Sequence, residues 1–160
     1  MRAPKALLAV PLALALALAA CGGGSGGQEA RDERRATGRA GGGTTVAVAD
    51  SALGSILVDG RGRTLYAFTK DKDTSGGCDA ECVAVWPALT GSSPASPGRG
   101  VEAVLLRQAR QPGGAVHVTY GDWPLYYYVG DAAAGDVNGQ GLEGEWFAVG
   151  PDGKLVRTPR

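Results

Sequence analysis

The sequence repeats itself at an offset of 60 residues, and this duplication constrains the fold more than any other feature of the chain. Each copy carries Leu-Tyr-x-aromatic-x-x-Asp and, further on, a Trp. The offset superposes Val58 on Val118, Leu65-Tyr66 on Leu125-Tyr126, Phe68 on Tyr128, Asp71 on Asp131, and Trp86 on Trp146. Two copies are too few for a solenoid, which normally needs at least three. We therefore expect the halves to pair about a pseudo-twofold axis and to share one core.

Short runs of β-branched and aromatic residues, separated by Gly, Asp and Asn, predict strands and hairpins from Thr44 onward. The predicted strands are residues 44–49, 55–58, 64–69, 101–107, 115–120, 123–129, 146–149 and 154–157. One or two helical turns are predicted at residues 80–85, around a Cys pair. The predicted fold class is mainly β. Two pseudo-symmetric β repeats, at about residues 52–92 and 112–153, form one small barrel or sandwich within a domain spanning residues 44–160.

The repeated aromatic and acidic residues admit two interpretations. Alternate side chains of a strand share a face, so each motif places its Tyr and its second aromatic residue on one side. These rings can build the core, with the Tyr hydroxyls bonded to the Asp carboxylates, or they can form a surface that recognises a ligand. The residues to which both interpretations apply are Tyr66, Phe68, Asp71, Trp86, Tyr126, Tyr128, Asp131 and Trp146.

The first 20 residues have the layout of an export signal, because Arg2 and Lys5 precede an uncharged apolar run. That run, Ala6 to Ala20, is shorter than the roughly 20 residues that a membrane-spanning helix needs. It ends in Leu18-Ala19-Ala20-Cys21, which resembles the bacterial lipobox, whose Cys thiol receives a diacylglyceryl group. The alternative is an ordinary secretory signal with a Cys near its cleavage site. We expect lipidation of Cys21 and an extracytoplasmic protein anchored to the cell membrane, or to an outer membrane if the host has two.

The segment after the lipobox, at residues 22–43, contains no aliphatic residue larger than Ala. Such a composition does not bury enough apolar surface to offset the entropy of ordering. With Cys21 it is predicted to be a flexible tether, with a root-mean-square reach of about 25 Å. Loss of residues 1–20 removes Arg2 and Lys5 and no acid, which changes a formal net charge of zero to −2. This weak charge argues against a nucleic-acid partner.

Cys78 and Cys82 are the only thiols that remain if Cys21 is lipidated. A pair of Cys residues in an exported protein favours a disulfide. Their C-x3-C spacing differs from the C-x-x-C of thioredoxin-like redox sites. Zinc needs about four ligands, and the single His of the chain is His117.

Sequence motifs of common enzyme classes are absent from the chain. It contains no G-x-S-x-G, no H-E-x-x-H and no phosphate-binding loop of the Walker type, and His117 falls in a predicted strand. No cofactor is expected, and we expect the protein not to be an enzyme. Two segments resemble the first half of a calcium loop but lack its Glu at position 12. Asp71, Asp73, Asp136 and Asn138 are therefore weak candidates for calcium ligands. The alternative is that these residues are present because they form turns.

Several elements occur together and in a fixed order. The Tyr-x-aromatic-x-x-Asp motif occurs twice, a Cys pair precedes Trp86-Pro87, and a Gly-Asp-x-x-Gly-Gln-Gly run precedes Trp146. In this order they resemble the bacterial secreted-repeat lipoprotein family over residues 52–153. The resemblance implies a lipid-anchored, two-repeat architecture. It implies no reaction, because the family has no generally assigned activity.

The sequence therefore favours a non-catalytic binding or envelope-associated module, held outside the membrane by the lipid on Cys21. Its expected partner is an envelope protein or a small molecule. One alternative is a redox or electron-transfer accessory protein, suggested by the Cys pair and the clustered Tyr and Trp residues. The other is an envelope domain stabilised by calcium.

Overall fold

The computed structural model describes residues 44–73, 77–110 and 116–159. The predicted signal segment, the lipidation site Cys21 and the predicted tether lie outside these residues. Within the described residues, no helix is both long and apolar enough to cross a membrane.

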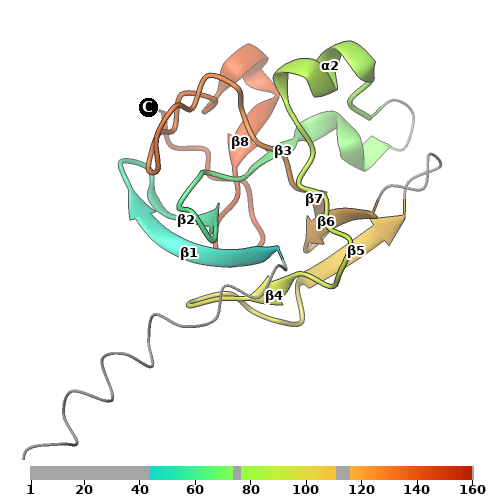
Figure 1. The fold of residues 1–160 in the computed structure, drawn as a ribbon. Coiled ribbons are helices and arrows are strands. Elements are labelled where there is room, and N and C mark those ends of the chain that lie inside the picture. The colour runs from blue at the N-terminus through green and yellow to red at the C-terminus, as the bar shows by residue number, and fades with distance from the viewer. Residues whose placement is uncertain (1–43, 74–76, 111–115, 160) are drawn as a thin grey trace, which may run out of the picture. The chain divides into compact units, whose positions relative to one another are not determined.

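The domain consists of three small sheets, and short helices connect some of the strands (Figure 1). In the first sheet, β1 (Thr45–Ser51) lies between an antiparallel neighbour, β2 (Gly54–Asp59), and a parallel one, β4 (Ser96–Pro97). The second sheet pairs β3 (Tyr66–Phe68) with β8 (Trp146–Ala148), and the third has the order β5 (Leu106–Arg110), β6 (Val116–Tyr120), β7 (Trp123–Pro124). The helical segments are η2 (Thr69–Asp73), α2 (Ala80–Val85) and η3 (Leu142–Gly144). The prediction of a mainly β fold is confirmed. Of the two predicted forms, barrel and sandwich, the arrangement is sandwich-like.

The two halves of the sequence exchange strands. β3 of the first repeat pairs with β8 of the second, with Tyr66 opposite Ala148, and Figure 1 shows these two strands side by side. The equivalent contact joins Tyr126 of the second repeat to Ala88 of the first. Tyr66 and Tyr126 also pair with each other, because each amide donates to the other's carbonyl at 2.9 Å. The pseudo-twofold axis therefore passes between these two tyrosines. The first and third sheets each lie within one half, whereas the second sheet takes one strand from each half.

One part of the predicted alignment of the repeats is wrong by a single residue. Leu57, and not Val58, is equivalent to Val118. The Leu57 amide donates to Val149 O at 2.8 Å, and the Val118 amide donates to the equivalent Leu89 O at 2.8 Å. The turn after β2 is one residue longer than its counterpart after β6. The Asp59 carboxylate stabilises that longer turn by accepting bonds from the amides of Arg61 and Arg63.

Two apolar clusters cover the opposite faces of the central strands. The first cluster contains Leu65, Ala67 and Leu125. The second contains Tyr66, Phe68 and Tyr126, whose side chains point the other way from those strands. Because successive strand residues alternate faces, the motif contributes to both clusters, as the sequence predicts for centrally placed strands.

Candidate functional site

Four aromatic rings, taken alternately from the two repeats, form a continuous stack in the second cluster. The indoles of Trp86 and Trp146 lie in its centre, with ring centroids 3.8 Å apart and ring planes 1° from parallel. Phe68 stacks on Trp146 at 4.5 Å, and Tyr128 packs on Trp86 at 4.5 Å with a tilt of 31°. Each repeat thus contributes one inner and one outer ring, and the stack joins the halves across the pseudo-twofold axis.

The two repeated tyrosines close the sides of this stack. Tyr66 meets Trp86 edge-on, with centroids 5.5 Å apart, and Tyr126 meets Trp146 edge-on at 5.3 Å. Edge-to-face geometry is favourable because the electropositive ring edge meets the electronegative ring face. The same contact is made in both repeats, so the symmetry extends from the strands to the side chains.

The Tyr66 hydroxyl binds the acid of the other repeat. It donates to Asp131 Oδ2 at 2.7 Å and accepts from the Gly139 amide at 3.2 Å. Asp131 Oδ1 accepts from the Asn138 amide at 2.9 Å. Burial, with the adjacent Asp131 carboxylate, raises the pKa of Tyr66 well above its ordinary value. Burial also raises the pKa of Asp131. Gly139 has to be small, because a Cβ atom there would lie 2.9 Å from both the Trp86 and the Tyr66 rings.

The second pair, Tyr126 with Asp71, has a different environment. Burial and the neighbouring Asp71 carboxylate raise the pKa of Tyr126. Burial raises the pKa of Asp71 as well, and Asp71 Oδ2 is enclosed without a hydrogen-bond partner among the described residues. His117 lies close by, edge-on to the Tyr126 ring at 4.8 Å, with Nε2 2.9 Å from Leu125 O. Burial lowers the pKa of His117, although the Asp71 charge opposes this shift.

His117 is the main difference between the two halves of the cluster. The register that equates Leu57 with Val118 equates His117 with Ile56, which is fully buried in the second cluster. Sequence reasoning treated His117 only as a residue in a strand and missed its place beside Asp71. Alignment of the repeats with the one-residue shift would have shown a His where the other copy has an aliphatic residue.

The structure places the repeated motif in the core. The exposed fractions are 0% for Tyr66, 4% for Tyr126, 5% for Trp86, 1% for Trp146 and 8% for Phe68. Tyr128, Asp71 and Asp131 are half-buried at the edge of the cluster. These positions fit the interpretation of the motif as core, with hydroxyl and carboxylate partnered between repeats, and not the interpretation as an open recognition surface.

Cys78 and Cys82 form a disulfide, with a Cα–Cα distance of 5.1 Å. This bond lies at the start of α2, where Asp79 caps the helix by accepting from the Cys82 amide at 2.9 Å. Both cysteines are half-buried against the second cluster. The predicted disulfide is confirmed, and it fixes the short segment that leads into Trp86.

Two of the weak calcium candidates, Asp136 and Asn138, make turn contacts. Asp136 Oδ2 accepts from the amides of Ala132 and Ala133, both at 2.9 Å. Asn138 donates its backbone N–H to Asp131 and its side-chain amide to Gly130 O. Across residues 44–73, 77–110 and 116–159, no three His, Cys, Asp or Glu side chains are grouped as metal ligands. These contacts fit the turn role that the sequence also suggests for Asp136 and Asn138.

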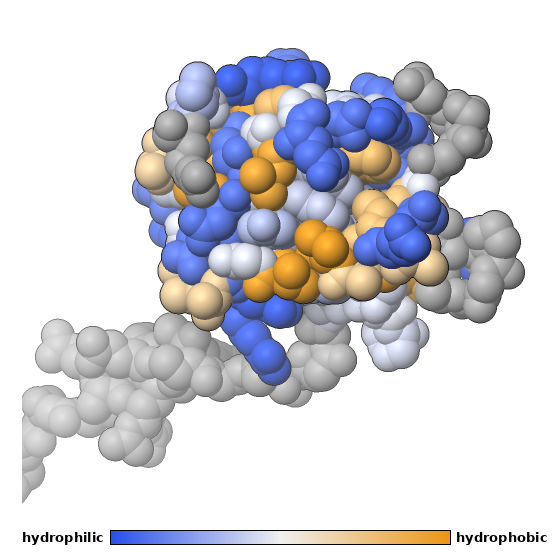
Figure 2. Space-filling model, turned by 90° about the horizontal axis from the view of Figure 1, so that it is seen from above, coloured by the Kyte–Doolittle hydropathy of each residue, from blue (hydrophilic) through white to orange (hydrophobic). Residues whose placement is uncertain are grey.

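Three of the four exposed large hydrophobic residues among the described ones lie on or beside α2. This helix has no buried residue, and Val83 and Val85 are 39% and 42% exposed. Val129, 60% exposed, lies beside the helix, because its amide donates to Val85 O at 3.1 Å. Figure 2 shows hydrophobic side chains gathered in patches among polar ones on the face seen from above. We call Val83, Val85 and Val129 the α2 patch. Exposed aliphatic residues of this kind are available for contact with a partner.

The exchanged strands, the alternating ring stack and the reciprocal Tyr–Asp pairs define a class of protein, a duplicated all-β module whose halves interlock. A family model described as a secreted repeat of unknown function matches the chain twice, at residues 47–90 and 109–150. The two matches cover more than half of the sequence, and the chain belongs to this family. The predicted resemblance is confirmed, and the family places the domain outside the cytoplasm. No curated protein matches the chain. No solved structure matches it either.

Proposed function

We propose that this protein is a lipid-anchored, non-catalytic module that binds another component of the cell envelope. The anchor is Cys21 at the end of the lipobox-like segment, and residues 22–43 are the tether. Two acyl chains on one Cys give stable membrane attachment, whereas a single chain binds only marginally.

The observation that carries the non-catalytic part of the proposal is the use of the repeated residues. A catalytic acid or base has to reach a substrate within hydrogen-bond distance. Tyr66 and Asp131 instead bind each other, and Trp86 and Trp146 are covered by other rings. The motif that dominates the sequence thus serves to join the halves, and recognition falls to the surface, where the α2 patch is a candidate contact.

The anchor is tested by labelling the protein with a radioactive fatty acid in a bacterial host. The wild-type chain should incorporate label and sediment with membranes, and Cys21→Ala should do neither. Cys78→Ala is the matched control, because that Cys forms the disulfide and should leave labelling unchanged. Equal labelling of wild type and Cys21→Ala would remove Cys21 as the anchor.

The binding role is tested by photo-crosslinking from the α2 patch. A photoreactive amino acid at Val85 should capture a defined envelope component in living cells. The same amino acid at Val104, which is 68% exposed, should capture much less of it. Turnover of substrates by the purified domain in a broad screen of hydrolase and redox reactions would contradict the non-catalytic role.

A second candidate function is electron transfer, and one observation favours it. The Trp86–Trp146 stack and the Cys78–Cys82 disulfide belong to the same cluster, so redox-active groups lie side by side. The test is the absorption spectrum and the thiol content of protein purified from its own host. Visible absorption, or a mixture of disulfide and dithiol, is the expected result for this function. A colourless protein whose disulfide stays fully formed in the presence of cellular reductants would dismiss it.

A further inference from the structure

β5 forms an open edge of the third sheet. The Val118 amide of β6 donates to Leu89 O at 2.8 Å, and its carbonyl accepts from the Leu125 amide at 3.0 Å. Both main-chain groups of Val118 therefore point away from β5. Gln108 lies opposite Val118. Because hydrogen-bonded and non-hydrogen-bonded pairs alternate along an antiparallel ladder, the N–H and C=O of Gln108 also point outward. No described residue pairs with them.

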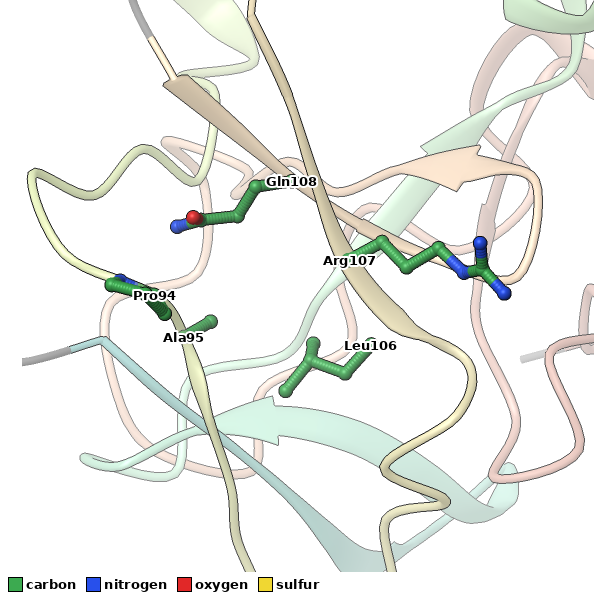
Figure 3. A pocket seen from close by; sticks show the side chains of 5 residues that line it. All are labelled: Pro94, Ala95, Leu106, Arg107 and Gln108. Carbon is green, nitrogen blue, oxygen red and sulfur yellow. The ribbon is translucent and has the colours of Figure 1, made fainter.

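A shallow hollow of about 150 Å³ runs along this edge. It is lined by Leu106, Arg107 and Gln108 of β5 and by Pro94 and Ala95 of the segment opposite (Figure 3). The Gln108 side chain reaches across one end and donates to Ser93 O at 2.8 Å. The hollow thus has an apolar wall at Leu106 and Ala95 and an unpaired strand edge along one side.

The two faces of β5 differ in chemistry. Leu106 and Gln108 point toward Pro94 and Ala95, whereas Arg107 points the other way (Figure 3). β5 carries Arg107 and Arg110 and no acidic residue. Charged side chains on an edge strand oppose pairing with a second copy of the same strand. They favour a strand of opposite charge instead.

We propose that the open edge of β5 binds an extended acidic peptide segment of another envelope protein as an added strand. The inference rests on the proposed binding role and names its partner. Main-chain bonds to Gln108 align the peptide, as in other cases of strand addition. Because side chains alternate, a small apolar residue of the peptide enters the hollow beside Leu106, and its neighbours are acidic and lie near Arg107. The expected pattern is acidic–apolar–acidic.

The test uses the purified full-length protein in detergent and two synthetic peptides, Glu-Val-Glu-Val-Glu and Lys-Val-Lys-Val-Lys, both blocked at their ends. The acidic peptide should shift the amide resonances of residues 106–110 in NMR spectra, and the basic peptide should not. Gln108→Pro removes the outward N–H and leaves the β5–β6 bonds intact, so it should weaken binding about tenfold. The control Gln108→Ala retains the N–H and should bind within about twofold of wild type.

Arg107→Glu should abolish binding of the acidic peptide without changing the far-ultraviolet spectrum. Hydrogen exchange of the Gln108 amide in the free protein tests the openness of the edge. Fast exchange supports the proposal. Slow exchange that depends on protein concentration would assign the edge to a second copy, and slow exchange at all concentrations would assign it to the chain's own residues before Thr44. Either result, or shifts confined to the α2 patch, would overturn the proposal while leaving the lipid anchor and the binding role in place.

Discussion

The hydroxyl of Tyr66 joins groups that come from distant parts of the sequence. It contacts the Asp131 carboxylate and the Gly139 amide, which lie 65 and 73 residues away along the chain. Hydrogen bonds that involve a charged group are stronger than neutral ones, and an unpaired buried partner costs free energy. One oxygen atom therefore helps to hold the two halves together.

We expect Tyr66→Phe to lower the free energy of unfolding by about 1–3 kcal/mol, because it leaves Asp131 and the Gly139 amide short of a partner. Urea unfolding followed by tryptophan fluorescence measures the loss. Tyr128→Phe is the control, because the Tyr128 hydroxyl makes no hydrogen bond to the described residues, and it should cost less than about 0.5 kcal/mol. Equal losses for the two variants would show that the hydroxyl of Tyr66 has no special role.

His117 makes the stability depend on pH. Its pKa in the folded protein lies below the ordinary value of 6.5, because burial disfavours the charged ring. The contribution of the neutral ring to the free energy of unfolding is complete above pH 6.5. This contribution is lost as the pH falls from 6.5 through the lower pKa of the folded protein, by at most about 1.4 kcal/mol per pH unit for one proton. Asp71 lies near His117, and burial raises the pKa of Asp71. Ionisation of Asp71 therefore lowers the stability of the folded protein as the pH rises above the ordinary pKa of an Asp.

We predict that His117→Ile, which copies Ile56 of the other half, removes part of the loss of stability between pH 6.5 and pH 5. Leu125 O keeps the bond from the Leu89 amide, so no buried carbonyl is left unpaired. The measurement is the urea midpoint at several pH values for both proteins. Parallel pH curves for wild type and variant would show that His117 does not contribute.

At the scale of elements, α2 depends on the disulfide more than on packing, because none of its residues is buried. The chain-entropy estimate for so short a loop is about 2 kcal/mol. The bond also fixes the direction of the chain as it enters the ring stack at Trp86, whose amide donates to Cys82 O at 2.7 Å.

The double variant Cys78→Ser, Cys82→Ser is expected to lose about 2 kcal/mol of stability. Hydrogen exchange of the amides in residues 79–85 should become faster. The amides of β3 and β8 should still exchange no faster than the whole domain unfolds. Val83→Ser, on the same helix and exposed, is the control and should leave exchange in α2 nearly unchanged. Faster exchange throughout the domain of the double variant would mean that the disulfide stabilises more than one local segment.

The sequence predicted the elements that follow local rules. The helix predicted at residues 80–85 is confirmed, and the predicted strands at 55–58 and 64–69 meet across a hairpin turn. Both depend on local chemistry, namely the cap at Asp79 and the Asp-Gly turn after Val58. The predicted strand at residues 123–129 is wrong as one element. The chain pairs with β6 only at Trp123 and Pro124, and Tyr126 then pairs with Tyr66 and Ala88. Such a change of partner depends on the fold of the other half, which strand patterns do not contain.

Two further strand predictions were wrong for identifiable reasons. Residues 101–105 form turns, with the Leu105 amide bonded to Glu102 O, so β5 begins only at Leu106. Residues 154–157 form a single bridge at Leu155. There the Gln140 side chain replaces a strand, because its Nε2 donates to Val156 O and its Oε1 accepts from the Ala148 amide. A buried side chain in the role of a backbone partner cannot be recognised from residue periodicity.

At the scale of the whole molecule, the exchange of strands makes the halves depend on each other. Four elements of this dependence are the β3–β8 pairing, the Tyr66–Tyr126 bridge, the alternating stack and the Tyr–Asp contacts. Because each is made between repeats, one repeat alone leaves its aromatic residues uncovered. The sequence predicted one core shared by the two repeats, and the structure has two clusters, each built from both repeats. The exchange of strands could not be predicted from the sequence.

We predict that a chain cut after Gly100 gives two fragments that fold only together. Two indoles stacked at 3.8 Å should give a coupled circular dichroism signal. Each fragment alone should lack this signal, and an equimolar mixture should regain it. Trp86→Phe in the first fragment is the control, and its mixture should fold without the signal. A single fragment that unfolds cooperatively would contradict the dependence of the halves.

The reciprocal Tyr–Asp contacts also bear on how such a chain arises. The Tyr66–Asp131 contact joins two copies of the motif. A polypeptide with only one copy can therefore form it only when its Tyr hydroxyl donates a hydrogen bond to the Asp of a second, identical chain. Two such chains would then satisfy both contacts at once, in a closed homodimer. Joining them end to end leaves every contact in place and raises the effective concentration of the partner. It also allows each half to change independently. His117 lies near Asp71, whereas the other half has Ile56 at the equivalent position. In a homodimer of identical chains, such a substitution would appear in both subunits at once.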